Sequence, residues 1–374
     1  MLVFSIIVLA LSLGTLGVVL LNVIGWRRVG KAQSTATVSV LIPARNEEAN
    51  LPECLETVRA NQSVHEILVA DDHSTDRTGA VVDDCASKDE RIRKITPLPL
   101  PDGWGGKTHA CHSLGQEATA HWLLFLDADA RLADDAVARM VRECERRNLT
   151  FLSCWPELEM RGFFERLLMP LLNFVLLTLF PAPLAARRKN HALGLAHGAC
   201  IMVRSDVYRD LGGHEPVRSE LFEDTRLAQH WRMKGHRSLC IDGTGTVRVR
   251  MYDSLGGIWS GFRKNLFPAF RGQVGFWLFM LLHGAVYLLP FALAFMVIDG
   301  SIVGVLFACA ALAVFVSRIL LALRFGHPLW SALLHPFAEL FLLAIGIASW
   351  WQVVTGRGVE WKGRRYLNTQ GEPV

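Results

Sequence analysis

Two aspartates one residue apart, Asp127 and Asp129, come directly after the apolar run 122–126. Two carboxylates in a turn behind a buried strand can reach the same ligand. A hard divalent cation that also binds diphosphate oxygens needs one or two carboxylates and open coordination positions. Because Asp is also common in turns, the pair predicts a metal site only in combination with other motifs.

Two further polar clusters follow apolar runs in the same way. Residues 43–48 (Pro-Ala-Arg-Asn-Glu-Glu) follow the run 38–42, and residues 71–76 (Asp-Asp-His-Ser-Thr-Asp) follow the run 66–70. Taken alone, Ser74, Thr75 and Asp76 are suitable caps for the next helix. Three polar clusters at successive strand ends are harder to explain by capping, and together they indicate one binding site.

Two later motifs add charge to this set. Residues 103–109 (Gly-Trp-Gly-Gly-Lys-Thr-His) combine a flexible loop, Lys107 and a helix start, which suits an anionic group, although a plain glycine-rich turn is the alternative. The spacing is not that of the phosphate-binding loop of nucleotide triphosphatases. Asp224 lies at a predicted helix start, where a carboxylate either stabilises the helix dipole or accepts the proton of an attacking hydroxyl.

The elements that position these residues lie between about residues 36 and 255. Short apolar runs alternate there with stretches of helical spacing such as 47–60 and 75–87. This alternation predicts an α/β domain with a parallel sheet built from βαβ units. Ligands bind at the carboxyl ends of the strands in such sheets, and the polar clusters fall at these ends.

Apolar segments flank the predicted domain. Residues 2–24, 276–298, 302–323 and 332–354 are each long enough to span a bilayer, which takes about 20 residues. Basic residues follow the first segment and none precedes it, which favours an uncleaved anchor (1–25) with the next domain in the cytoplasm. A buried core helix is the alternative. We therefore expect a multi-pass protein of the cell membrane.

The C-terminal region (274–355) raises a problem of parity. If all three of its segments cross, the basic tail (356–374) lies outside, against the positive-inside tendency. We expect one segment to be re-entrant or interfacial, and 332–354 is the first candidate because it contains His335, Pro336 and Glu339. For the apolar stretch 163–186 inside the α/β domain, we expect an interfacial helix, with a span as the alternative.

Composition excludes several classes of protein. The chain has 374 residues, 51% of them hydrophobic and 20% charged, and its mean hydropathy is +0.27. A net charge of +4 is too small to imply a nucleic-acid partner. The eight cysteines contain no Cys-x-x-Cys pair, which indicates free thiols in a reducing compartment.

The order of the motifs resembles that of family 2 glycosyltransferases of the GT-A type. The resemblance covers roughly residues 38–253 and rests on segments 43–48, 71–76, 127–129, 212–214 (Gly-Gly-His) and 222–224 (Phe-Glu-Asp). Each segment alone is weak, but their combination is highly specific. The resemblance implies an α/β, Rossmann-like domain with a mixed, mostly parallel sheet, and inverting transfer from a nucleotide-diphosphate sugar.

The same resemblance implies roles for single residues. Asp224 would be the catalytic base, and Asp127 and Asp129 would hold the ribose and the diphosphate-bound Mn²⁺ or Mg²⁺. The metal would offset the charge that builds on the departing diphosphate. The remaining donor-binding residues would be Pro43, Ala44, Glu47, Asp71 or Asp72, Lys107, Gln229 and Arg232.

Two departures from the family pattern bear on function. His73 stands where glycine is usual. Processive members carry Gln-x-x-Arg-Trp, whereas residues 229–233 (Gln-His-Trp-Arg-Met) have Met in the place of Trp. We therefore expect transfer of a single sugar rather than synthesis of a polymer.

Within the family, the chain is similar to bacterial carotenoid-acid glycosyltransferases and to hopanoid-associated ones. The likeness rests on segments 106–111, 213–214 and 359–366 and on the N-terminal anchor. It implies UDP-glucose as donor and a hydrophobic lipid acceptor such as a carotenoid acid. The stretch 163–186 and the region around Trp259, Phe262 and Phe267 are candidate walls for this acceptor, with ordinary interfacial packing as the alternative. Residues 361–365 would lie near the active site or bind anionic headgroups.

Three alternatives stay open. The acceptor of the same reaction could be a polyprenyl phosphate or another membrane lipid. A non-catalytic, sugar-binding membrane scaffold would not need Asp127, Asp129 and Asp224, yet all three are present. A transporter would need more intramembrane ionisable residues than His283, Arg318 and Glu339.

Overall fold

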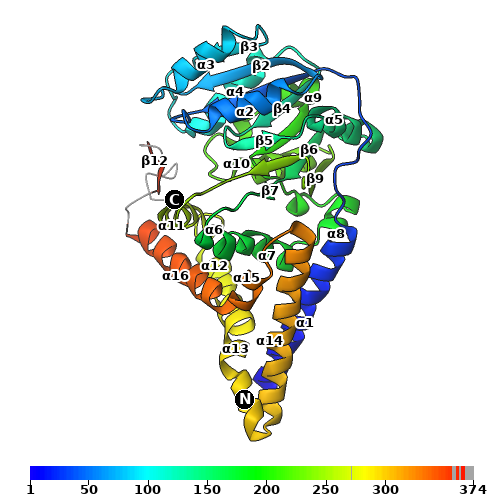
Figure 1. Cartoon of the computed structure of the whole chain (residues 1–374), viewed down its shortest axis with the longest axis vertical. Coiled ribbons are helices and arrows are strands. Elements are labelled where there is room, and N and C mark those ends of the chain that lie inside the picture. The colour runs from blue at the N-terminus through cyan, green and yellow to red at the C-terminus, as the bar shows by residue number, and fades with distance from the viewer. Residues whose placement is uncertain (271, 356–358, 362–363, 367–374) are drawn as a thin grey trace.

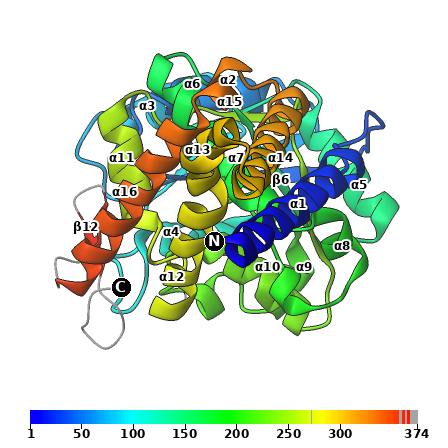
Figure 2. The same ribbon diagram turned by 90° about the horizontal axis from the view of Figure 1, so that it is seen from below.

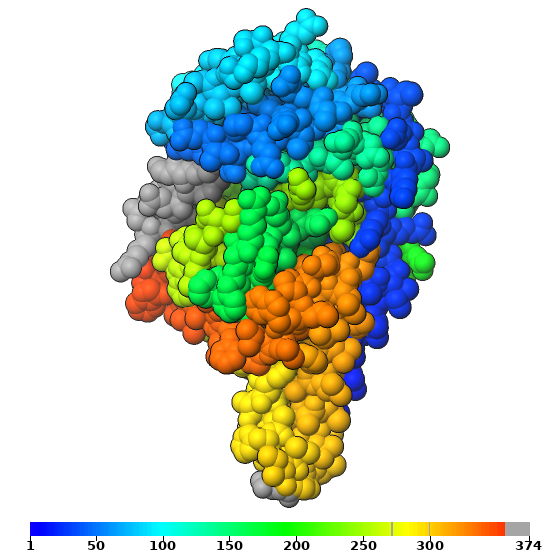
Figure 3. All heavy atoms as spheres, in the orientation of Figure 1, coloured from blue at the N-terminus to red at the C-terminus, as the bar shows by residue number. Residues whose placement is uncertain are grey.

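The computed structural model describes residues 1–270, 272–355, 359–361 and 364–366 of the chain. Figure 1 shows an α/β domain above a group of apolar helices that narrows toward the N-terminus. Figure 3 shows the same outline with all atoms, and α13 (Leu289–Leu293, yellow) and α14 (Ile302–Phe325, orange) lie toward its narrow end.

The α/β domain is built on a seven-stranded mixed sheet with the order β3-β2-β1-β4-β8-β6-β9. β1 is parallel to β2 and β4, and β6 is parallel to β9, whereas β8 runs antiparallel to β4 and β6. The predicted mixed, mostly parallel sheet is therefore confirmed. Its strands are β1 (Val38–Ala44), β2 (Val64–Asp71), β3 (Ile92–Ile95), β4 (Trp122–Leu126), β6 (Phe151–Trp155), β8 (Cys200–Arg204) and β9 (Ser238–Asp242).

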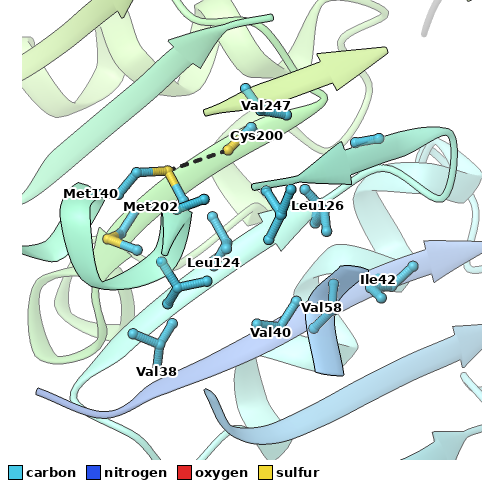
Figure 4. Close-up of a cluster of buried hydrophobic side chains, with 14 of the residues drawn as sticks. Val38, Val40, Ile42, Val58, Leu124, Leu126, Met140, Cys200, Met202 and Val247 are labelled. Atoms are coloured by element: carbon cyan, nitrogen blue, oxygen red, sulfur yellow. Dashed lines mark hydrogen bonds between the residues drawn. The ribbon is translucent and has the colours of Figure 1, made fainter. Parts of the chain in front are cut away.

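Helices cover both faces of this sheet, because its central strands are apolar on both sides. Successive side chains of a strand point to opposite faces. Val40 packs on the face covered by α2 and α5 (Figure 4), and Leu41 packs on the face covered by α4, α9 and α10. The helices are α2 (Leu51–Arg59), α3 (Thr78–Ala86), α4 (Gly106–Glu117), α5 (Ala136–Arg147), α9 (Ser205–Asp210) and α10 (Glu223–Met233), with single 3₁₀ turns at η1 (His191–Leu193) and η2 (Glu215–Val217).

A small second sheet continues the chain behind the Asp-x-Asp motif. Its strands are β5 (Ala130–Leu132), β10 (Val247–Val249) and β7 (Glu157–Leu158), in that order. β5 begins one residue after Asp129 and pairs antiparallel with β10. The two aspartates therefore lie in a turn that is held by β4 on one side and by β5 on the other.

The stretch 163–186 forms three short helices, where a single interfacial helix was expected. They are α6 (Phe163–Leu168), α7 (Pro170–Leu179) and α8 (Ala182–Arg187). Proline lacks a backbone N–H and disfavours helix at the preceding residue, so the breaks fall at Pro170 and at Pro181. The stretch lies between the α/β domain and the long apolar helices (Figure 1).

Four helical segments of the described chain are long and apolar enough to cross a membrane: Leu2–Gly25, Gln273–Ile298, Ile302–Phe325 and His335–Val354. They include α1 (Leu2–Gly25), α14 (Ile302–Phe325) and α16 (His335–Val354). The second segment changes helix type along its length, through α12 (Gln273–Leu282), the π-helical η3 (His283–Leu288), α13 (Leu289–Leu293) and the 3₁₀ helix η4 (Ala294–Asp299).

The four segments are not arranged alike. α1 and α14 pack against each other along the narrow end, whereas α16 lies oblique to them beside α11 (Leu255–Asn265) and does not reach that end (Figures 1 and 2). The short helix α15 (Trp330–Leu333) precedes α16. After α16 in the chain, the backbones of β11 (Val359–Trp361) and β12 (Arg364–Tyr366) pair antiparallel. The side chains of residues 361–365 are outside the described part of the chain. The predicted contact of this tail with the active site or with anionic headgroups therefore stays a prediction.

Candidate active site

A pocket opens at the carboxyl ends of β1, β2 and β4, where the sequence predicts the binding site. It is lined by Pro43, Ala44, Arg45, Glu47, Asp72, Lys107, Ala110, Asp127, Ala128 and Asp129. The structure thus brings together residues from four of the five predicted motifs, and only the Asp224 motif is absent from the described lining. Three of these four follow parallel strands, which end at the same edge of a sheet.

Lys107 is the central cation of the site. Its Nζ lies 2.7 Å from Oδ1 of Asp127 and 3.2 Å from Oε1 of Glu223. Burial lowers the pKa of Lys107, but the carboxylates of Asp127 and Glu223 outweigh it and hold that pKa well above its usual value. Lys107 therefore stays charged, and it joins the Asp-x-Asp turn to the start of α10.

Asp224 lies in the first turn of α10, on the other side of Lys107. Its Oδ1 accepts a hydrogen bond of 2.6 Å from the backbone N–H of Thr225. Burial and the neighbouring carboxylate of Glu223 raise the pKa of Asp224 to about 7, although Lys107 and backbone N–H groups oppose the shift. A carboxylate whose pKa lies near neutrality is matched to proton transfer at physiological pH.

Gly198 allows this cluster to form. A Cβ atom at Gly198 would lie 2.9 Å from Nζ of Lys107 and 3.4 Å from Oδ2 of Asp224. The backbone just before β8 therefore passes directly beneath the cation and the candidate base. A side chain at this position would push these charged groups apart.

The two aspartates at the end of β2 point in different directions. Asp72 is buried and lines the pocket. Asp71 instead accepts a hydrogen bond of 3.1 Å from the N–H of Ser74, and its Oδ2 would lie 2.7 Å from a Cβ at Gly79 in α3. Of these two predicted donor-binding residues, the structure brings only Asp72 to the pocket.

The loop behind β1 is tied to the loop behind β2. Arg45 donates a hydrogen bond of 2.6 Å to the carbonyl of Asp72, and the N–H of Glu47 donates one of 2.8 Å to Oγ1 of Thr78. His73, in the place where glycine is usual, has a φ of 54°. This left-handed conformation explains the preference for glycine, and His is among the residues that tolerate it.

Gln229 and Arg232, expected at the donor site, do not line this pocket. Gln229 accepts a hydrogen bond of 3.0 Å from Arg226. The guanidinium of Arg232 donates to Oγ of Ser238 at 2.9 Å and to several backbone carbonyls, among them that of Ala185 at 3.1 Å. These contacts hold α8 and the segment after it against α10, so in this structure Arg232 serves the packing of the domain.

The Gly-Gly-His segment also lies in the core. Nδ1 of His214 is 2.8 Å from the hydroxyl of Tyr208, and its ring packs edge-on against Phe125. Burial lowers the pKa of His214 to about 3. Gly213 has a φ of 60°, and a Cβ there would lie 2.8 Å from the Tyr208 ring, so close packing accounts for this glycine.

Four residues of the site were not among the site residues predicted from the sequence: Arg45, His197, Gly198 and Glu223. Arg45 and Glu223 lie inside predicted motifs, so their positions were already marked. His197 lies just before Gly198; burial and Lys107 lower its pKa to about 4, against the attraction of Asp127. No strand-end pattern marks His197 and Gly198, because β8 runs antiparallel and the chain enters the site at its start.

The carboxylates at the pocket fit a hard divalent cation. Among the described residues, no three His, Cys, Asp or Glu side chains form a group that could hold a metal ion by themselves. Mg²⁺ is usually bound by one or two carboxylates together with substrate phosphates and water. Asp127 and Asp129 supply such oxygens at the pocket wall, which fits a cation that is completed by a diphosphate.

Residues 39–212 match the sequence profile described as "Glycosyl transferase family 2". The chain contains a family 2 glycosyltransferase domain. The match spans β1 to the end of α9 and includes the pocket and Gly198, while α10 with Asp224 follows it. The protein is therefore a glycosyltransferase, and its resemblance to this family is confirmed.

The glycosyltransferase is also similar to named proteins along most of its length. It is 26% identical over 360 residues to a 4,4'-diaponeurosporenoate glycosyltransferase of Staphylococcus aureus strain MRSA252, with 88% of each chain covered. Its structure is similar to that of a mannosyltransferase from Pyrobaculum calidifontis solved with GDP-Man and Mn²⁺, at a TM-score of 0.53, 18% identity and coverage of 93% and 99% of the two chains. The predicted GT-A fold is thus confirmed.

Proposed function

We propose that this glycosyltransferase transfers one glucose from UDP-glucose, with inversion, to a hydrophobic lipid acceptor such as a carotenoid acid. The observation that carries the proposal is the pair of Lys107 and Asp127 at the strand-end pocket, with Asp224 beside Lys107. The α/β domain that holds them lies above a set of apolar helices (Figure 1). The name of the Staphylococcus aureus relative supports a carotenoid acid as acceptor.

The donor would bind along the pocket, with its nucleotide against Pro43, Ala44, Glu47 and Asp72. Asp127 and Asp129 would hold Mn²⁺ or Mg²⁺ together with the diphosphate. When bound, this cation supplies Lewis-acid stabilisation of the negative charge on the leaving diphosphate. Lys107 is placed beside the same aspartate to add a second positive charge.

For a hydroxyl acceptor, Asp224 would act as the general base. The acceptor oxygen attacks the anomeric carbon, the bond from that carbon to the diphosphate oxygen breaks, and Asp224 takes the hydroxyl proton. Only the ionised form of Asp224 can do this. Because the pKa of Asp224 is raised to about 7, we expect kcat/KM for a hydroxyl acceptor to rise with pH up to about 7.

A carboxylate acceptor predicts the opposite dependence. It carries no proton at neutral pH, so it needs no base, and an ionised Asp224 would repel it. Transfer to a carotenoid acid should therefore fall as pH rises through about 7. The raised pKa of Asp224 favours a hydroxyl-bearing membrane lipid as the second candidate acceptor, and the pH profile separates the two.

We also propose a membrane topology. α1, residues 273–298 and α14 would each cross, and α16 would lie at the cytoplasmic interface, since it does not extend along the narrow end with α1 and α14. The α/β domain and the basic tail then both lie in the cytoplasm, as positive charges favour. The functional units would be the anchor (1–25), the transferase domain (36–255), the membrane region (274–355) and the tail (356–374).

The decisive experiment measures transfer of labelled glucose from UDP-glucose to a bacterial lipid extract by the solubilised protein with Mn²⁺. Wild type should give a labelled, extractable product whose mass identifies the acceptor, and Asp84→Asn, an exposed change in α3, should do the same. If only another sugar nucleotide gives a labelled product, the sugar of that donor replaces glucose in the proposal. No product from any donor with carotenoid acids and hydroxyl lipids would overturn the proposal.

A further inference from the structure

A second groove lies away from the strand-end pocket, where α1 meets the α/β domain. It has a volume of about 610 Å³ and lies between the last turn of α1, α8 and the edge strand β9. Figures 1 and 2 both show α8 beside the C-terminal end of α1. The groove uses none of the residues that line the donor pocket.

The elements around this groove are joined by specific contacts. Asn22 donates to the carbonyls of Leu177 and Phe180, at 2.9 Å and 2.8 Å, and accepts from the N–H of Ala182 at 2.8 Å. Nε1 of Trp26 donates to the carbonyl of Cys240 at 3.0 Å. These bonds join α1, α7, α8 and β9, so the groove is part of the packed structure.

The position of α8 depends on a glycine at the end of α1. A Cβ at Gly25 would lie 2.7 Å from Cγ of Pro183, so any other residue would push α8 away. The walls beside this contact are apolar and open to the surroundings. Leu21, Ile24 and Leu184 are 45%, 84% and 41% exposed.

The rim of the groove is positively charged. Arg27, Arg147 and Arg187 line it, and none of the described lining residues is acidic. Arg147 is paired with Glu143 at 2.6 Å. Arg27 and Arg187 are exposed and have no carboxylate partner among the described residues, so their charges are available to a ligand.

We propose that this groove binds an anionic glycerophospholipid. Its phosphate would lie between Arg27 and Arg187, and an acyl chain would run along Leu21, Ile24 and Leu184 toward the membrane. Basic groups at the cytoplasmic end of a spanning helix attract anionic headgroups, and here they border a groove large enough for a headgroup and the start of a chain. The inference rests on the proposed membrane anchorage and is independent of which sugar or acceptor the enzyme uses.

Native mass spectrometry of the full chain in detergent tests this site with equal amounts of phosphatidylglycerol and phosphatidylcholine. Wild type should retain phosphatidylglycerol preferentially. The double variant Arg27→Gln/Arg187→Gln should weaken phosphatidylglycerol binding about 5-fold for each arginine removed. A preference that persists in this variant, or equal retention of both lipids by wild type, would overturn the proposal.

Two further variants separate the groove from general charge and from misfolding. Lys88→Gln/Arg93→Gln removes the same charge from exposed positions of the α/β domain and should keep the lipid preference. Leu184→Asp adds a carboxylate to the exposed rim, leaves both arginines in place and should also weaken phosphatidylglycerol binding. Because sugar transfer is not measured, a negative result here leaves the proposed enzymatic activity standing.

Discussion

Ionisable side chains cluster in two regions of this molecule, and the two clusters differ in how far they are exposed. At the strand-end pocket, Lys107 and Asp127 are 27% and 28% exposed and border open space. Within the apolar helices, His283 hydrogen-bonds to Glu339, and both side chains are fully buried. Arg318 is also buried nearby, and its Nη2 lies 3.4 Å from the carbonyl of Ser331.

The balance of charge also differs between the two regions. Among the described residues, four carboxylates and two cationic side chains line the pocket, which leaves an excess of negative charge that a divalent cation would neutralise. In the helix bundle, two of the polar side chains bond to neighbouring helices: His283 pairs with Glu339, and His335 meets the carbonyl of Tyr287 at 3.1 Å. We infer that the pocket serves a ligand and that the buried cluster fixes how the helices pack.

The largest effect should come from the candidate base. Asp224→Asn should lower transfer to a hydroxyl acceptor by about 10²–10⁴-fold, the usual contribution of a general base, while donor binding stays unchanged. Steady-state transfer assays and a donor titration measure the two effects, with Asp84→Asn as control. Full turnover in Asp224→Asn would remove the base from the mechanism and would favour a carboxylate acceptor.

The next effect should come from the candidate metal ligand. Asp129→Ala should weaken Mn²⁺-dependent donor binding by about 100-fold, since removing even residues that support a metal ligand costs about 10–100-fold. Calorimetric titration of UDP-glucose with and without Mn²⁺ measures this change. An unaltered dependence on Mn²⁺ would contradict a metal role for Asp129.

Gly198 tests how tightly the pocket is packed. Gly198→Ala would place a Cβ 2.9 Å from Nζ of Lys107 and should lower kcat by about 10–100-fold, because small displacements of reacting groups are costly. Gly256→Ala in α11 is the matched control, because a Cβ there meets no atom of the described residues within 4 Å. Equal activity of the two variants would show that the base and Lys107 need no such close arrangement.

The smallest effect on catalysis should come from the helix bundle. Glu339→Gln keeps the size of the side chain but weakens its hydrogen bond to His283, so the melting temperature should fall by about 2–4 °C while the transfer rate stays within about 2-fold. Thermal unfolding and transfer are measured on the same preparation, with the exposed Leu340→Ala as control. A large loss of transfer without a change in melting temperature would give the buried cluster a catalytic role.

Much of the site was predictable because parallel strands bring distant segments together in a regular way. Polar residues that directly follow β1, β2 and β4 had to meet at one edge of the sheet, which is where Glu47, Asp72 and Asp127 lie. The sequence did not predict Gly198 as a site residue, because Gly198 precedes the antiparallel strand β8, whereas the predicted residues follow parallel strands. Asp71 and Arg232 have the residue types of a binding site, yet local hydrogen bonds turn them toward the protein.

The sequence alone determined the α/β domain, its confirmed family and the presence of long apolar helices, because these depend on hydrophobic period, segment length and the order of motifs. Tertiary structure decided which of two adjacent aspartates faces the pocket, that Lys107 joins Asp127 to Glu223, and that α8 meets the end of α1. These features depend on side-chain direction and on close contacts between segments far apart in the chain. The residues in such contacts do not recur at a regular spacing along the sequence, so no local sequence pattern reveals the contacts.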